Sequence, residues 1–464
     1  MFKKAEWNTL LRLAVVIVSS LIALGSMYLS FYLRFAGNIP YRNYSAFQAN
    51  YLWIVVGFIV INFLFGTYVF YNKNLLDLFY FTMLSELALT CYIMVLIYAR
   101  SRLTFPRSVL LINFVLGTFI LFIYNAIVYM IYQKVRGHKR VMIVGENERV
   151  LEAVRNFDAM KNQRHQVTHV ILSNYLSNIK AYASEVDIVY MTGQIDEAVR
   201  TKVYEYLMQE SKKLFLSSEF EHLMMLNANV MNFDDESVLE ISNFEINPEE
   251  AVLKRAFDLI VSVALLIVTS PIMLITAILI KLDSPGPIFY KQERITKGGH
   301  HFNILKFRSM SETAERESGP VLATKDDARI TRVGRFIRST RIDELPQLIN
   351  VLKGDMSLVG PRPERPFFVK QYAEQNPYYT LRHNVQAGIT GYAQVYGKYS
   401  SDFNRKLNFD LLYIKNYSLA FDFKLLFRTT KILFDKVSSR GFEEEVERVE
   451  DEWQDYEDQM TIIK

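Results

Sequence analysis

Four long apolar stretches occupy the first part of the chain. They cover residues 13–33, 51–71, 78–98 and 109–132. Each approaches the roughly 20 residues that an α-helix needs to cross a bilayer. Tyrosines near their ends, together with Trp53, suit the interface between membrane and water. The pattern predicts a bundle of four membrane-spanning helices over residues 1–138.

Positive charges flank these stretches unevenly. Lys3 and Lys4 precede the first, Lys73 lies between the second and third, and four basic residues follow the fourth: Lys134, Arg136, Lys139 and Arg140. Basic loops tend to stay in the cytoplasm, and the number of spans is even. We therefore expect the N-terminus and everything after residue 140 to be cytoplasmic. Glu86 falls in the middle of the third span, where a carboxylate is costly. A functional role and packing against a neighbouring helix both stay open for it.

From residue 139 to 247 short apolar strands alternate with helical stretches, a pattern typical of an α/β domain with a parallel sheet. The first strand runs into Gly145, as in a dinucleotide-binding turn. That turn needs two further glycines, and the sequence continues Glu146-Asn147-Glu148-Arg149-Val150. We therefore expect a Rossmann-like domain with a structural or regulatory role. The sequence leaves open whether it binds a ligand.

A fifth apolar stretch covers residues 256–280. It is long enough to span the membrane, but Lys254 and Arg255 flank one end and Lys281 flanks the other, so charge selects neither side. Ser270 and Pro271 fall inside it, and a proline there removes a backbone hydrogen bond and kinks a helix. These features predict a re-entrant segment over residues 254–281, with a helix–break–helix at Ser270-Pro271 that enters and leaves by the same face.

The densest chemistry follows this segment. Arginines recur through residues 329–341 at roughly every third position, which gathers them on a helix. The adjacent acids Asp343 and Glu344 come directly afterwards. Arginines bind phosphate oxygens, and carboxylates hold divalent cations that neutralise a transferred phosphoryl group. One of the two carboxylates could itself attack phosphorus. The pattern indicates phosphoryl transfer with Asp343 and Glu344 as catalytic residues.

Basic side chains on both sides of the acidic pair are candidates for binding substrate phosphates. Arg362 stands between two prolines that stiffen the backbone presenting it. A structural salt bridge is the competing interpretation for that arginine. The complete set of candidate phosphate-binding residues is Lys306, Arg308, Arg338, Arg341 and Arg362.

Composition narrows the function classes. Half of the residues are hydrophobic, and the formal net charge of +4 is too small to indicate a nucleic-acid partner. The single cysteine, Cys91, excludes a disulfide framework and a cysteine-based zinc site. The last stretch, residues 439–464, is acidic and carries apolar residues at spacings of three and four, which predicts a helical tail. The positions are Phe442, Val446, Val449, Trp453, Tyr456 and Met460. This tail could dock on its own protein, on another subunit or on the basic region.

Several sequence motifs between the fifth apolar stretch and residue 391 follow one another in an order that resembles one enzyme family. From about residue 254 to 431 the chain resembles the bacterial sugar transferases, monotopic polyprenyl-phosphate phosphoglycosyl transferases. The preceding spans and α/β domain resemble the long subgroup, which primes capsular and exopolysaccharide synthesis. The resemblance rests on Lys254-Arg255 with Asp258, Ser270-Pro271, Ser284-Pro285-Gly286-Pro287, Lys306-Phe307-Arg308-Ser309-Met310, Asp343-Glu344-Leu345-Pro346-Gln347, Gly354-Asp355-Met356-Ser357-Leu358-Val359-Gly360-Pro361-Arg362-Pro363 and Gly388-Ile389-Thr390-Gly391.

The resemblance implies a fold and a reaction. It implies a mainly α-helical catalytic domain over residues 248–438, bound to the bilayer by the re-entrant helix. The aspartate matching Asp343 attacks the sugar-bearing phosphate of a UDP-sugar and releases UMP. Undecaprenyl phosphate then accepts the sugar phosphate, with glucose or galactose as the leading expectation for the sugar. Mg²⁺, with Mn²⁺ as an alternative, is expected at Asp343 and Glu344, and arginines matching Arg338 and Arg362 should contact phosphates.

The same resemblance implies a bacterial cytoplasmic membrane location. It also implies two further kinds of partner, a second copy of the chain and other proteins of polysaccharide assembly. Two rival functions would also combine membrane spans with an α/β domain or with polysaccharide assembly. A membrane-anchored nucleotide-sugar epimerase or dehydratase would need an intact glycine fingerprint and a Tyr-x-x-x-Lys pair in residues 139–247, which has neither. A regulatory scaffold of polysaccharide assembly would not need the acidic pair and its arginines.

Overall fold

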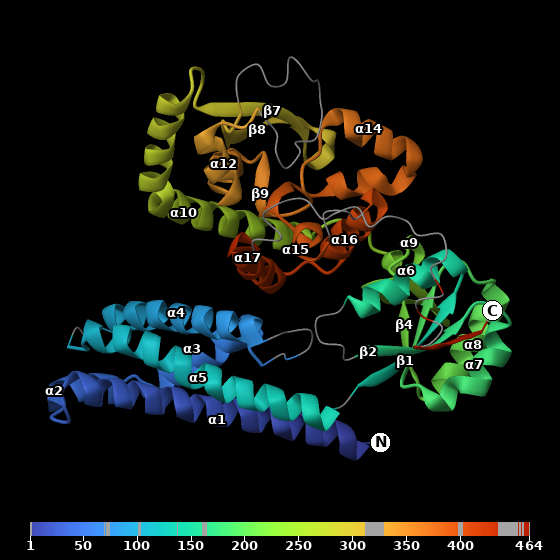
Figure 1. Ribbon diagram of the computed structural model, residues 1–464, viewed down its shortest axis with the longest axis horizontal. Helices are drawn as coiled ribbons and strands as arrows, with labels where there is room; N and C mark the ends of the chain where they lie inside the picture. Colours follow the sequence, from blue (N-terminus) through green and yellow to red (C-terminus); the bar gives the residue numbers. More distant parts are fainter. Residues whose placement is uncertain are drawn as a thin grey trace. The chain divides into compact units, whose positions relative to one another are not determined.

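The computed structural model describes most of the chain: residues 2–68, 70, 75–100, 104–136, 138–159, 165–310, 329–397, 402–434, 453, 456 and 459–463. Its contacts divide it into two compact units. One comprises Met1–Ser217 with Val449–Lys464, and the other is Ser218–Arg448. Figure 1 shows a helical bundle, an α/β domain and a mainly helical part, which together match the fold class predicted from the sequence.

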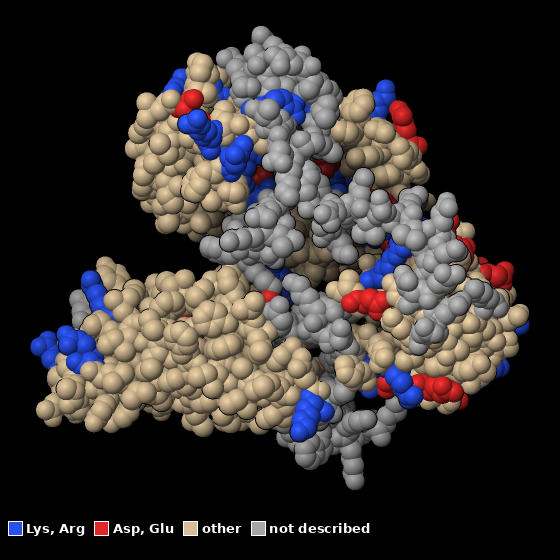
Figure 2. Space-filling view, in the orientation of Figure 1, with Lys and Arg blue, Asp and Glu red and all other residues tan. Residues whose placement is uncertain are grey.

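The bundle consists of α1 (Phe2–Arg34), α2 (Tyr41–Gln48), α3 (Tyr51–Leu64), α4 (Leu75–Ala99) and α5 (Arg107–Arg136). Three of its helices are long and apolar enough to cross a membrane, over Leu13–Arg34, Leu75–Ala99 and Arg107–Lys134. On the face drawn in Figure 2, the bundle is uncharged along its length and carries its charged side chains at its ends. This distribution suits a surface in contact with lipid.

The second predicted span, residues 51–71, differs from the prediction. Helix α3 ends at Leu64, and its 14 residues reach about 21 Å, less than the hydrocarbon core. A turn follows in which Gly66 has a φ of 62°, a left-handed conformation that ends the helix. Helices α2 and α3 pass the length and hydropathy test as a pair, bent by 51° at Ala49-Asn50. The sequence located the apolar run, but neither the bend nor the early end.

Glu86 points into the bundle. Its side chain is 1% exposed, and its Oε1 has no hydrogen-bond partner within the part of the chain that the structure describes. A Cβ on Gly117 of α5 would stand 3.0 Å from Glu86 Oε2, so the glycine makes room for the carboxyl group. Ser26 donates to Asn113 beside it, at 2.9 Å. The structure therefore favours packing of Glu86 against neighbouring helices over contact with lipid.

The α/β domain has a parallel sheet, as predicted. Its elements are β1 (Lys139–Gly145), α6 (Asn147–Asp158), β2 (His165–Ile171), α7 (Tyr175–Tyr182), η1 (Ala183–Glu185), β3 (Ile188–Thr192), α8 (Glu197–Gln209) and β4 (Lys213–Leu216). The strand order is β11-β2-β1-β3-β4, and all pairs are parallel. Gly145 is needed for packing, because a Cβ there would stand 1.9 Å from the carbonyl oxygen of Thr192 on β3. The Glu146 side chain lies beside Gly193 at the same edge.

The fifth strand comes from the end of the chain. Strand β11 (Thr461–Ile463) pairs in parallel with β2, so the predicted helical tail is wrong for these residues. Three β-branched residues in succession favour a strand, and β2 offers an open edge. Trp453 donates from Nε1 to Asn147 Oδ1 at 2.7 Å, and Trp453, Tyr456 and Ile462 pack against the apolar core between α6 and the sheet. The heptad positions Phe442, Val446 and Val449 lie outside the described residues.

The second unit opens with α9 (Phe220–Met224) and the hairpin β5 (Asn229–Phe233) and β6 (Glu236–Glu240). Leu223 and Phe244 belong to its core, so this unit begins earlier in the chain than the predicted boundary at residue 247. Two strand pairs lie among the helices of this unit. One is the antiparallel pair β7 (Phe289–Ile295) and β8 (His301–Phe307), joined by η2 (Lys297–Gly299). The other is the parallel pair β9 (Met356–Val359) and β10 (Ala387–Thr390). These helices are α10 (Pro248–Asp283), α12 (Arg332–Ser339), α13 (Gln347–Lys353), α14 (Pro366–Gln375), α15 (Tyr392–Tyr396), α16 (Phe403–Lys415) and α17 (Leu419–Phe434), with the short η3 (Ile342–Glu344) and η4 (Pro377–Asn384).

Helix α10 is continuous but bent. It contains the predicted interruption at Ser270-Pro271, and the backbone there stays helical, so the helix bends without breaking. Figure 1 shows the bend plainly. Proline removes one helical hydrogen bond, and Thr269 and Ser270 donate back to the carbonyls of Leu265 and Ile267 at 2.7 and 2.8 Å, which favours bending. Because of the bend, both halves of α10 pack on the same unit, the first against its main core and the second against α12 and β8.

Candidate active site

The acidic pair lies in a short turn between two helices. Asp343 and Glu344 end the single turn η3, which follows α12 and precedes α13. Arg341, just before it, has a left-handed φ of 57°, unusual for a residue with a side chain. This conformation ends the α12 segment abruptly and starts the new turn. Adjacent carboxyl groups thereby enter different surroundings.

Glu344 is surrounded by three cations from three parts of the chain. Its Oε1 lies 3.0 Å from Lys306 Nζ on β8, 3.8 Å from a nitrogen of Arg341 and 3.8 Å from a nitrogen of Arg362. Burial alone would raise the pKa of this carboxyl group. The charges of Lys306, Arg362 and Arg341 outweigh burial and lower the pKa to about 2. Glu344 is therefore ionised at any physiological pH.

Asp343 has the opposite character. Its side chain is 8% exposed, and burial together with the adjacent charge of Glu344 raises its pKa to about 6, against the opposing charges of Lys306, Arg341 and Arg338. Its Oδ1 is buried and accepts no hydrogen bond from any residue that the structure describes. An unpartnered, buried carboxylate oxygen near a cationic cluster is suited to nucleophilic attack or to metal binding.

The acidic pair offers few protein ligands for a metal. Among the described residues no group of three or more His, Cys, Asp and Glu side chains could hold an ion. Mg²⁺, however, is commonly bound through one or two carboxylates, with water and substrate phosphates completing its shell. The free Oδ1 of Asp343 fits that requirement, whereas Glu344 Oε1 is already shared among cations. The residues present therefore fit a Mg²⁺ ion that arrives with a phosphorylated substrate.

Four of the five predicted phosphate-binding residues act on the acidic pair. Lys306, Arg341 and Arg362 contact Glu344, and Arg338 acts electrostatically on Asp343. The fifth, Arg308, is occupied elsewhere. Its buried guanidinium donates to the carbonyl oxygens of Ser284 and Pro285, both at 2.7 Å, and so ties the end of α10 to β8. Ser270 and Pro271 stay in α10, where they shape the helix.

Sequence reasoning missed two arginines that hold the Arg362 loop, the buried Arg382 and the partly buried Arg294. Arg382 donates to the Arg362 carbonyl at 2.9 Å, and Arg294 donates to the Pro363 carbonyl at 3.0 Å. Neither arginine lies in a run whose spacing suggested chemistry. The sequence alone does not reveal their role, because it does not show whether an arginine lies in the interior or on the surface.

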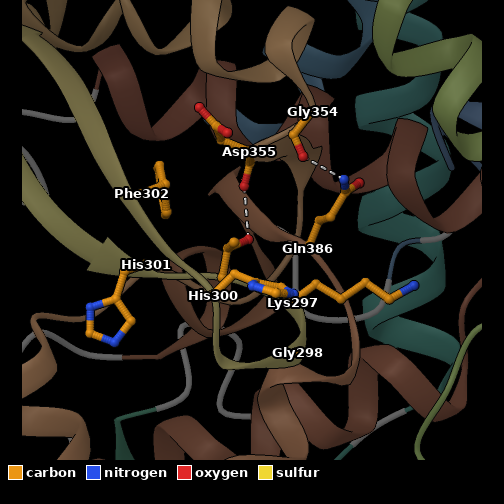
Figure 3. A pocket seen from close by; sticks show the side chains of 9 residues that line it. Lys297, Gly298, His300, His301, Phe302, Gly354, Asp355 and Gln386 are labelled. Atoms are coloured by element: carbon orange, nitrogen blue, oxygen red, sulfur yellow. Dashed lines mark hydrogen bonds between the residues drawn. The ribbon is translucent and has the colours of Figure 1, made fainter.

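A separate hollow of about 460 Å³ lies at the turn between β7 and β8. It is lined by Thr296, Lys297, Gly298, His300, His301, Phe302, Gly354, Asp355 and Gln386, and by none of the predicted site residues. Figure 3 shows Lys297 and His301 pointing in opposite directions from it. Thr296 and Gln386 donate to the backbone carbonyls of Asp355 and Gly354, at 2.8 and 2.7 Å. These two bonds fix the walls of the hollow and occupy the polar groups of Thr296 and Gln386.

Comparison with known proteins agrees with this arrangement. The family described as bacterial sugar transferase matches residues 249–436. The chain is 46% identical over 197 residues to a UDP-N-acetylgalactosamine-undecaprenyl-phosphate N-acetylgalactosaminephosphotransferase of Aeromonas hydrophila, covering 42% of this chain and 46% of that protein. It is 34% identical over 255 residues to the UDP-glucose:undecaprenyl-phosphate glucose-1-phosphate transferase of Escherichia coli (strain K12), covering 54% and 55%. The chain thus spans about half the length of these two curated relatives.

A shorter relative is matched over its whole length. This is the exopolysaccharide production protein PSS of Rhizobium leguminosarum bv. phaseoli, 40% identical over 201 residues, which are 42% of this chain and 100% of that protein. The family match covers α10 from its second residue, the acidic pair, all five predicted phosphate-binding residues and the whole of α17. On these grounds the chain belongs to the bacterial sugar transferase family.

Proposed function

We propose that this protein transfers a sugar phosphate from a UDP-sugar to undecaprenyl phosphate and thereby starts the synthesis of a capsular or extracellular polysaccharide. One observation carries the proposal. Asp343 and Glu344 are adjacent, yet Glu344 is held ionised by three cations while the pKa of Asp343 is about 6. Adjacent carboxyl groups with separated pKa values can take different chemical roles. The names of the relatives in Aeromonas and Escherichia support the class of donor and acceptor.

In the first step an oxygen of the Asp343 carboxylate attacks the sugar-bearing phosphorus. The bond from that phosphorus to the bridging oxygen breaks, and UMP leaves with the electron pair. The products are UMP and a sugar phosphate linked to Asp343. Lys306, Arg341 and Arg362 are held near the reacting phosphates by Glu344, where they offset developing negative charge. A bound Mg²⁺ ion would add charge neutralisation at the pyrophosphate.

In the second step an oxygen of undecaprenyl phosphate attacks the same phosphorus. The bond to Asp343 breaks, the carboxylate is restored, and the lipid carries a diphosphate-linked sugar. A covalent intermediate lets the donor and the acceptor use one site in turn. The site never has to hold two polyanions together, which would be costly because their charges repel.

The bend and the exposed apolar surface of α10 support a re-entrant membrane arrangement. Its exposed apolar residues suit lipid, and its bend allows it to enter and leave by one face; among them Val263, Ile267, Leu274 and Ile278 are between 46% and 69% exposed. With the N-terminus in the cytoplasm, such a re-entrant helix keeps residues 284–434 on the cytoplasmic side, where UDP-sugars are made. The acceptor phosphate then meets the acidic pair at the membrane surface of a bacterial cytoplasmic membrane.

The test is UMP release by the full-length protein in lipid nanodiscs with Mg²⁺. UDP-glucose, UDP-galactose, UDP-N-acetylglucosamine and UDP-N-acetylgalactosamine are supplied with and without undecaprenyl phosphate. We expect one of them to release a single equivalent of UMP without acceptor and to turn over continuously with it. Asp343→Asn should lose at least about 1,000-fold of the rate, since it removes the nucleophile. Wild-type UMP release by Asp343→Asn would disprove the assignment, and release of UDP would indicate ordinary glycosyl transfer.

A further inference from the structure

The backbone that presents Arg362 is tied down at every residue from 360 to 364. Gly360 donates to the Thr390 carbonyl at 2.8 Å, and the Pro361 carbonyl accepts from Gly388 at 2.9 Å. The carbonyls of residues 362, 363 and 364 accept from Arg382, Arg294 and the backbone of Ile295, at 2.9, 3.0 and 3.2 Å. Prolines fix φ at two of these positions. The Arg362 side chain is 46% exposed, so its place depends on this backbone rather than on packing.

Arg382 is the most deeply buried of these ties. It is 4% exposed and forms a buried ion pair with Asp410 of α16, donating from Nε at 3.0 Å and from a terminal nitrogen at 2.7 Å. That same terminal nitrogen donates to the Arg362 carbonyl, and the other donates to the Tyr379 hydroxyl at 2.9 Å. The guanidinium plane is therefore fixed by Asp410 on α16, Tyr379 on η4 and the Arg362 loop.

Stability alone is a poor explanation for this pair. Removing an arginine and an aspartate from water costs several kcal/mol per ion, and apolar residues of similar volume often replace a buried pair with no loss of stability. A buried pair is useful where it fixes a geometry. In this pair, a terminal nitrogen of Arg382 also donates to the backbone carbonyl of Arg362, whose side chain contacts Glu344.

We infer that Arg382, oriented by Asp410, is a positioning residue that sets the place of the Arg362 guanidinium beside Glu344. The inference rests on the proposed function, because its effect is measured on phosphoryl transfer. Arg382 does not touch substrate in this arrangement and acts through the Arg362 backbone. Catalytic groups misplaced by about 1 Å can lose on the order of 100-fold in rate, so the effect should be large although the residue is remote.

The experiment is a double-mutant cycle on the full-length protein in nanodiscs, with kcat and KM of UMP release as readouts. Arg382→Lys keeps the charge but loses the fork that spans Asp410 and the Arg362 carbonyl. Arg382→Met with Asp410→Leu removes both charges and keeps the volume. Each is made alone and together with Arg362→Ala. Lys415→Met is the matched control, because Lys415 is another buried cation on α16 and donates to the carbonyls of Met224 and Ser242 instead of to the Arg362 loop.

We expect both Arg382 variants to lower kcat about 10- to 100-fold while KM changes less. In the Arg362→Ala background, the same changes should add less than about twofold, because the residue through which they act is gone. The control should keep the wild-type rate per folded molecule. Full, additive losses in the Arg362→Ala background would overturn the inference, and so would an unchanged kcat in the charge-free pair variant. Failure of the proposed function looks different, since the wild type itself would then release no UMP.

Discussion

Asp343 and Glu344 differ in pKa because their neighbours differ, although both are carboxylic acids in one turn. The sequence predicted the pair, and it predicted that basic residues from 306 to 362 would gather around it. It could not predict which of the two would have the lowered pKa, because that depends on distances of 3.0 to 3.8 Å to cations from three parts of the chain. It also could not separate Arg308, which holds backbone carbonyls, from Lys306 two residues earlier, which contacts Glu344.

The raised pKa of Asp343 predicts a stability effect that is independent of activity. Burial and the charge of Glu344 raise this pKa from 3.8 to about 6, so deprotonation costs the folded state. The contribution of Asp343 to stability is fully present below pH about 4 and is lost as the pH rises through about 6. Asp343→Asn cannot deprotonate and should therefore be more stable than the wild type above pH 6, by about 1–3 kcal/mol.

Thermal unfolding in detergent at pH 4.5 and pH 8 measures this effect. The gain in Tm should be small at the lower pH and clear at the higher one. The opposite order, with a larger gain at low pH, would show that Asp343 is not destabilised by ionisation.

Substitutions of Arg308 and Arg341 should affect different properties, the first mainly stability and the second mainly activity. Arg308→Met leaves the partly buried carbonyls of Ser284 and Pro285 without their donor and should cost about 2–4 kcal/mol of unfolding free energy. Arg341→Met removes a side chain that is 37% exposed and should cost much less, but it weakens the charge around Glu344 and should lower UMP release. Thermal unfolding and initial rates on both variants check this. Equal thermal loss in both would contradict it.

At the scale of elements, apolar pattern was a reliable guide to where helices form and a poor one to how they bend. The run at 51–71 forms α3, which ends early and makes a bent pair with the preceding α2, and the run at 256–280 lies in one bent helix. Hydropathy sums over side chains, whereas a bend depends on single residues such as Pro271 and on hydroxyl groups that bond to the backbone. The strand–helix alternation after residue 139 was predicted correctly, because period and turn residues are local signals.

The bend in α10 gives a topological prediction. In a variant with Cys91 replaced by serine, a cysteine in place of Lys297, in the exposed turn between β7 and β8, should react with a membrane-impermeant maleimide only in inside-out vesicles. A cysteine in place of Lys139, at the start of β1 in the α/β domain, is the matched cytoplasmic control. Reaction of the Lys297 cysteine from outside intact cells would mean that α10 spans the membrane.

At the scale of the whole molecule, the second unit is inserted into the α/β domain. The chain leaves the parallel sheet after β4 and returns to it as β11. The return of the chain to the sheet was not predicted from the sequence, because the heptad spacing of apolar residues 442–460 indicated a helix. Pairing with a strand some 290 residues earlier also produces no pattern in the local sequence. Residues 461–463 form a strand because they pair with the edge of β2, and Ile462 packs against the apolar core that contains Phe157.

Truncation before Trp453 tests the role of this strand. Removing residues 453–464 exposes the edge of β2 and part of the apolar core beside α6, so amides of residues 165–171 should exchange with solvent at least about tenfold faster. UMP release should change less than about twofold, because none of the proposed site residues lies in that segment. Hydrogen exchange followed by mass spectrometry and an activity assay measure both. Unaltered exchange over β2 would show that the strand does not hold the sheet.

The place of β11 also has a consequence in time. A ribosome adds about 5–20 residues per second, so tens of seconds separate the emergence of β4 from that of β11. Throughout that interval the nascent sheet carries a bare edge at β2, able to pair with any other extended chain nearby. Strand β11 covers this edge only after the whole inserted unit has been made, so a ribosome that stalls within that unit leaves a sheet with an unpaired edge that is prone to aggregation.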